Sequence, residues 1–161
     1  MGTAAKHTTT VDTPSDVELV ITRVVDAPLA LVWECWTKPE HVRNWLLGPD
    51  GWTMTECELN FEPGGKWRMS WAKENGSAIT IEGVTQEVVP LERIVSTESW
   101  GPEWPDTLNT TALAERDGAT TITLTIRYQS MELRDAALKT GATDGMATTY
   151  NRLDAYLRTL Q

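Results

Sequence analysis

The chain has 161 residues, of which 40% are hydrophobic and 23% charged, and this composition excludes a disordered or membrane-embedded chain. Its formal net charge of −9 argues against nucleic acid or an anionic membrane as a partner, because both select basic surfaces. All eight tryptophans lie between Trp33 and Trp104, so we ask whether they line a binding site.

The N-terminal part predicts a tail, a strand and two short helices. Residues 1–16 are polar and lack an apolar signal core, so we expect a disordered tail on a cytoplasmic protein. The β-branched run 17–25 predicts a strand. Helical spacing of apolar residues predicts a helix over 29–37, and a second begins at Pro39. The two cysteines form no paired motif and are interpreted as buried, reduced thiols.

The middle of the chain predicts an antiparallel meander, because short β-type runs alternate with turn residues such as Asn75-Gly76 and Asp117-Gly118. The expected strands are 52–61, 66–72, 78–89, 93–100, 107–115 and 119–128. A helix follows over 131–139, capped by Ser130, and a long amphipathic helix runs from 142 to about 160.

These elements predict an α+β fold of the helix-grip type, with residues 17–161 as a single domain. A curved antiparallel sheet (a strand, two short helices, then six meander strands) wraps around the long C-terminal helix. One helix cannot fill the concave side of such a sheet, so we expect a cavity between the sheet and the helix.

Several segments together resemble the SRPBCC (START-like) superfamily, and more narrowly its bacterial branch related to the activator of heat-shock-protein-90 ATPase. The segments are DAPLALVWECWTKPEHVRNWLLGPDGWTM, EPGGKWRM, EGVTQEVVPLERIV, GPEWPDTL and TGATDGMATTYNRLDAYL. The resemblance implies the helix-grip fold and an apolar cavity. It implies no single activity, since members include small-molecule binders, cyclase-like enzymes and co-chaperone domains.

Three positions depart from the pattern that this superfamily commonly shows. Leu46, Ala142 and Met146 carry smaller or softer side chains than the residues usual there. If they face the cavity, it is wider and more adaptable. That would suit a bulky ligand or an engineered pocket, and ordinary drift within the family explains the changes equally well.

Candidate ligand-binding residues come from strands with alternating aromatic or methionine side chains and from the inward stripe of the long helix. Trp67, Met69 and Trp71 share one strand face, as do Trp52 and Met54, and either face is plain core or a cavity wall. The candidate set is Trp45, Trp52, Met54, Met69, Trp71, Trp100, Leu108, Thr110, Ala142, Met146, Thr149, Tyr150 and Leu153.

Two carboxylates are candidate catalytic groups. Alternation places Glu56 on the face of Trp52 and Met54, where burial would raise its pKa and suit it to acid–base work. The competing interpretation is an ordinary carboxylate that lies near the sheet edge or forms an ion pair with Arg68. Glu98, two residues before Trp100, is the second candidate on the same argument.

The leading functional hypothesis is the binding of a small apolar or aromatic ligand between sheet and helix by a monomer or homodimer. The alternatives are an enzyme of the cyclase, lyase or eliminase type that uses a cavity carboxylate, and a co-chaperone-like interaction domain. No set of side chains has metal-ligand spacing and no nucleotide motif is present, so we expect neither a metal nor another cofactor.

Overall fold

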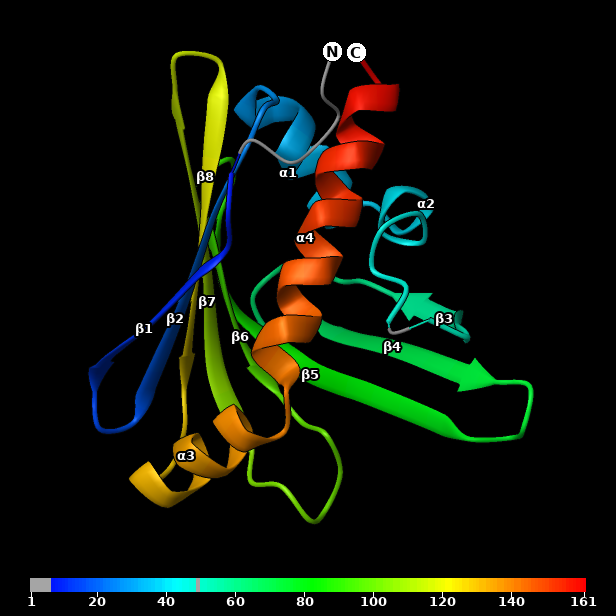
Figure 1. Cartoon of the computed structure of the whole chain (residues 1–161), viewed down its shortest axis with the longest axis vertical. Helices are drawn as coiled ribbons and strands as arrows, with labels where there is room; N and C mark the ends of the chain where they lie inside the picture. Colours follow the sequence, from blue (N-terminus) through cyan, green and yellow to red (C-terminus); the bar gives the residue numbers. More distant parts are fainter. Residues whose placement is uncertain (1–6, 49) are drawn as a thin grey trace.

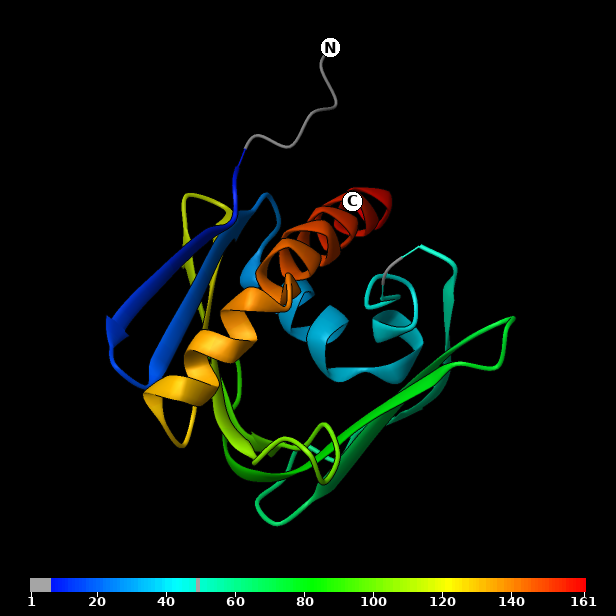
Figure 2. The same cartoon turned by 60° about the horizontal axis from the view of Figure 1, so that its bottom comes forward.

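The structure, a computed structural model, describes residues 7–48 and 50–161. There, an eight-stranded antiparallel sheet curves around the C-terminal helix in the order β1-β2-β8-β7-β6-β5-β4-β3 (Figures 1 and 2). The strands are β1 (Thr10–Ser15), β2 (Glu18–Val25), β3 (Trp52–Glu58), β4 (Lys66–Lys73), β5 (Ala78–Val89), β6 (Arg93–Glu98), β7 (Thr107–Arg116) and β8 (Ala119–Arg127). The helices are α1 (Leu29–Thr37), α2 (Pro39–Val42), α3 (Met131–Lys139) and α4 (Ala142–Thr159). The predicted helix-grip fold is confirmed.

Strand β1 corrects the prediction of a disordered tail over residues 1–16. Residues 10–15 pair antiparallel with β2, with Thr10 opposite Thr22 and Asp12 opposite Val20. The polar composition suits an edge strand, and Pro14 lies in the irregular part of the pairing, where a missing N–H costs little. Residues 1–6 of the predicted tail lie outside the described residues.

The first of two apolar clusters joins α1 and α4 to the concave face of β2, β7 and β8. Strand β2 alternates strictly between partly exposed and buried residues, as expected where one face of a sheet is covered. Tyr150, Leu153 and Leu157 of α4 enter this cluster and are fully buried. Figure 2 shows α4 crossing the hollow of the sheet. The predicted inward stripe of α4 therefore anchors the fold.

The second cluster lies under α2, on the same concave face of β3, β4 and β5. Its buried members are Val42, Met54, Cys57, Trp67, Trp71 and Ile81. Between the two halves of the sheet, β5 bends closely over β6 at Gly83. A Cβ atom on Gly83 would lie 1.9 Å from the carbonyl oxygen of Thr97, so this approach requires glycine.

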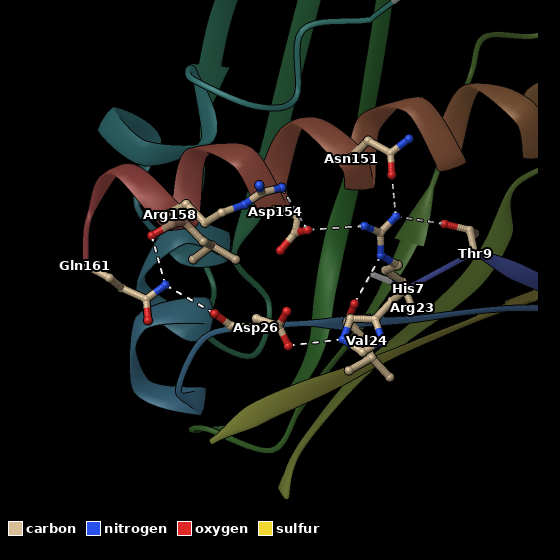
Figure 3. A network of polar contacts seen from close by, with 10 residues as sticks. His7, Thr9, Arg23, Val24, Asp26, Asn151, Asp154, Arg158 and Gln161 are labelled. Carbon is tan, nitrogen blue, oxygen red and sulfur yellow. Dashed lines mark hydrogen bonds and ion pairs between the residues drawn. The ribbon is translucent and has the colours of Figure 1, made fainter. Parts of the chain in front are cut away.

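A polar network fastens α4 to β2 (Figure 3). The Arg23 guanidinium lies 3.5 Å from a carboxylate oxygen of Asp154, and it donates to Asn151 Oδ1 at 2.6 Å and to the carbonyl of Val24 at 3.1 Å. Arg158 reaches the same Asp154 carboxylate one turn further along α4. Because Arg23 and Asp154 are both buried, the network fixes where α4 lies across the sheet.

Candidate functional site

A strip of polar side chains runs along the concave face between the two apolar clusters. Strand pairing sets Glu98 opposite Thr107, Ser96 opposite Asn109 and Ile94 opposite Thr111. Leu113, further along β7, faces the first cluster, so positions 107, 109 and 111 face the same way. We call Ser96, Glu98, Thr107, Asn109 and Thr111 the polar floor.

Solvent reaches the polar floor. Thr107 is buried, whereas Ser96, Glu98, Asn109 and Thr111 are only partly buried, although all five lie on the helix-facing side. Inner residues of the neighbouring strands β8 and β2, such as Ile122 and Leu19, are almost completely excluded from water. The concave face is therefore tightly packed on β2 and β8 and more open over β6 and the first half of β7.

A chain of hydrogen bonds orients the Glu98 carboxylate on this floor. The Thr107 hydroxyl donates to Asn109 Oδ1 at 2.7 Å, and the Asn109 side chain donates in turn to Glu98. Trp100 Nε1 donates to Glu98 Oε2 at 2.9 Å. Burial raises the pKa of Glu98 above its ordinary value, and the two donated hydrogen bonds lower it in part.

Tyr128, which follows β8, is the ionisable neighbour of Glu98. Burial and the Glu98 charge raise the pKa of Tyr128 to about 12, so its hydroxyl stays protonated at neutral pH. Tyr128 also packs against the first apolar cluster, as do Leu138 of α3 and Met146 of α4. The loop over residues 99–106 and α3 both lie at the end of the molecule where α4 begins (Figure 1).

The predicted helix residues lie in three different environments. Thr149, Tyr150 and Leu153 are buried, Met146 is partly buried, and Ala142 is exposed. The Tyr150 hydroxyl has no hydrogen-bond partner among the described residues, although its side chain is fully buried. The hydroxyl of Tyr150, a predicted ligand-binding residue, therefore lies within the core.

The prediction that Glu56 shares a face with Trp52 and Met54 is wrong. A β-bulge between Met54 and Glu56 inserts one extra residue, so Glu56 pairs with Ser70 on the outer face. There Arg68 donates to Glu56 at 2.9 Å, and Ser70 donates at 3.1 Å. The ion pair with Arg68, which the sequence offered as the alternative, is present, and Glu56 does not face α4.

Leu108 and Thr110 also point away from the helix. They pair with Thr97 and Val95, on the outer face of the sheet, since the inward positions of β7 are the odd-numbered ones. Every second residue before the apolar Leu113 shares its face of the strand, and this rule selects Asn109 and Thr111 instead. This signal in the sequence identifies the β7 part of the polar floor.

The predicted tryptophan wall is largely core. Trp52, Met54, Met69 and Trp71 do share the concave face, but they pack in or against the second cluster, and Trp71 Nε1 donates to the Leu46 carbonyl at 2.8 Å. Trp45, predicted to bind the ligand, is buried and donates to the Cys35 carbonyl at 2.9 Å. Trp100 is the exception, half-exposed beside Glu98.

Two surface hollows adjoin each other, since both are lined by Thr97 and Asp106. The first, of about 540 Å³, includes the outward-facing side chains of Lys66, Arg68 and Glu82. The second, of about 490 Å³, crosses the strand ends at Leu108 and Arg127. Their charges are mixed, so neither hollow has the apolar lining predicted for the ligand site.

Among residues 7–48 and 50–161, no helix is both long and apolar enough to cross a bilayer. No curated protein matches the chain in sequence. Solved structures with a similar fold include a Rhodobacter sphaeroides protein with 27% identity and a TM-score of 0.88, over 95% of this chain and 99% of that one. The Mycobacterium smegmatis protein Ms6760 has 21% identity and a TM-score of 0.81, over 92% of this chain and 95% of that one.

A further similar structure is DynU16, a protein of the dynemicin biosynthetic locus. It has 23% identity and a TM-score of 0.69, over 92% of this chain and 49% of that one. The family model described as Activator of Hsp90 ATPase homolog 1-like protein matches residues 26–158. Since that match spans most of the sequence, the chain belongs to this family, within the SRPBCC superfamily.

Proposed function

We propose that this protein binds a small apolar or aromatic ligand between α4 and the concave face of the sheet, over the polar floor. The observation that carries the proposal is that four helix-facing polar residues remain accessible to water between two apolar clusters. A site of this kind offers apolar walls and a few converging polar groups, as small-molecule sites usually do. The superfamily fold commonly binds hydrophobic ligands, which supports the proposal.

Neighbouring threonines on β7 provide a matched test. Thr111 faces the helix side and Thr110 the outer side, and both are partly buried. The neutral dye N-phenyl-1-naphthylamine, which fluoresces in apolar sites, is titrated into the protein and each variant. Thr111→Trp should weaken binding at least about tenfold by filling the space, whereas Thr110→Trp should leave it unchanged.

Folding of each variant is checked by circular dichroism. A further variant, Ser96→Leu on the adjacent strand β6, fills less of the proposed ligand space than Thr111→Trp does. Equal dye binding by the wild type, Thr111→Trp and Ser96→Leu would contradict the proposed location. Absence of dye binding to the folded wild-type protein would contradict the function itself.

A second candidate function is proton transfer within the same site, because the Thr107–Asn109–Glu98 chain holds a carboxylate in one orientation. A general base needs such a fixed position and a pKa raised toward neutrality. In that case Glu98→Gln would retain ligand binding and lose turnover, measured by mass spectrometry of the bound compound before and after incubation. Turnover retained in Glu98→Gln would refute this role.

A further inference from the structure

We infer that the ligand carries a protonated amine beside its apolar body, and that Glu98 and the Trp100 ring recognise this ammonium group. The inference rests on the proposed function and specifies its ligand class. Three observations support it. Glu98 can still accept hydrogen bonds, its charge has no ion-pair partner among the described residues, and the Trp100 ring lies beside it.

The hydrogen-bond directions around Glu98 leave it as an acceptor. Trp100 Nε1 can only donate, and Asn109 presents its NH₂ group because its Oδ1 already accepts from Thr107. A carboxylate has about four lone-pair positions, and these two donors use two of them. The remaining lone pairs can accept hydrogen bonds from a ligand, and an ammonium group has up to three N–H donors.

Charge balance points the same way. The other acid deep in the concave side, Asp154, is paired with Arg23 and Arg158, and Glu56 on the outer face is paired with Arg68. Among the described residues, no basic side chain forms an ion pair with Glu98. A partly buried carboxylate without a counter-ion is costly, so a bound cation would stabilise the site as well as the ligand. The net charge of −9 also favours the approach of cations.

The Trp100 indole supplies the second half of the recognition. Its side chain is 50% exposed, and its N–H bond to Glu98 holds the ring beside the carboxylate. Cations bind over an indole face within about 6 Å of the ring centre. Tyr128 adds a neutral aromatic ring in the same neighbourhood, since its hydroxyl keeps its proton. An oriented carboxylate next to aromatic rings fits an organic ammonium better than a purely apolar molecule.

Three probes of nearly the same shape test the inference: 2-naphthylmethylamine, which is protonated at neutral pH, 2-naphthylmethanol and 2-acetonaphthone. Binding is measured by calorimetry at neutral pH with the full chain. The wild-type protein should bind the ammonium about tenfold more tightly than the alcohol or the ketone. Glu98→Gln should remove that preference and leave the affinity for the alcohol within about twofold. Trp100→Leu should weaken ammonium binding about threefold.

Glu56→Gln is the matched control, because it removes a carboxylate from the outer face and should leave all three affinities unchanged. Equal or weaker binding of the ammonium by the wild type would overturn the inference without any variant. A preference for the ketone would show that Glu98 donates its proton instead. Binding of the alcohol without ammonium preference would leave the proposed function standing, whereas binding of none of the probes would remove both proposals.

Discussion

The guanidinium of Arg23 on β2 and the carboxylate of Asp154 on α4 form an ion pair in which each side chain is at most 4% exposed. Removing one partner of a buried pair leaves an uncompensated charge. We expect Asp154→Ala to lower the free energy of unfolding by about 3–5 kcal/mol, measured by urea denaturation. Arg158→Ala, which removes a half-exposed partner of the same carboxylate, should cost less than about 1 kcal/mol. Equal losses in the two variants would contradict this assignment.

Replacing glycine with alanine should lower the stability of the protein at one position and raise it at another. Gly83→Ala would place a methyl group against the Thr97 carbonyl, so strands β5 and β6 must separate. We expect the free energy of unfolding to fall by about 3 kcal/mol or more, which is at the upper end of the range for overpacking. Gly145→Ala in α4 meets nothing within 4 Å and should gain about 0.5–1 kcal/mol from helix propensity. Thermal unfolding followed by circular dichroism measures both, and a neutral Gly83→Ala would show that the two strands are not closely apposed.

The raised pKa of Glu98 predicts how stability changes with pH. The unfolded chain releases this proton near the ordinary pKa of 4.5, and the native protein releases it at a higher pH. Between these values the native state holds more protons, so stability falls as the pH rises through the window. Glu98→Gln should therefore be more stable than the wild type at neutral pH and equally stable below pH 4.5. Melting temperatures across this range test the prediction.

Glu56→Gln is the control for that series. Because Glu56 lies on the outer face with Arg68, its loss should lower stability slightly, by at most about 1 kcal/mol at neutral pH. The two substitutions thus have opposite expected signs. A destabilising Glu98→Gln at neutral pH would mean that the ionised carboxylate stabilises the native state.

The Tyr150 hydroxyl should cost stability in the free protein. It is fully buried without a partner among the described residues, and a buried hydroxyl that makes no hydrogen bond carries its desolvation penalty. We expect Tyr150→Phe to raise the free energy of unfolding by about 1 kcal/mol, since the ring keeps its packing beside Trp36. A loss of stability in guanidinium denaturation would show that the hydroxyl has a partner in solution.

Much of the fold follows from local sequence signals. Helix α3 begins and ends where its pattern predicts, and the Ser130 side chain accepts from Leu133 N as a helix cap. Strand β5 matches its prediction residue for residue, because β-branched residues are bounded by Asn75-Gly76 and Pro90. Such signals act within a few residues, so they can be recognised without knowledge of the partner strands.

The errors arise where tertiary pairing decides. The bulge before Glu56 is invisible in the alternation of β3, and it reverses every side chain that follows. Trp45 looks like a loop residue beside Gly48, but its packing against Trp36, at 5.0 Å between ring centres, makes it core. The polar floor depends on bringing β6 beside β7 with Glu98 opposite Thr107, which neither strand alone specifies.

The polar floor also divides the apolar interior into two parts. Among the described residues, the apolar side chain that packs against both clusters is Leu46. Parts of a domain unfold as one cooperative unit when many contacts connect them. In this protein, a strip of polar residues separates the two apolar clusters. A ligand with an apolar body over Ser96 and Asn109 would bridge the strip. Binding would then raise the cooperativity of unfolding as well as its midpoint, because the ligand would complete the interior.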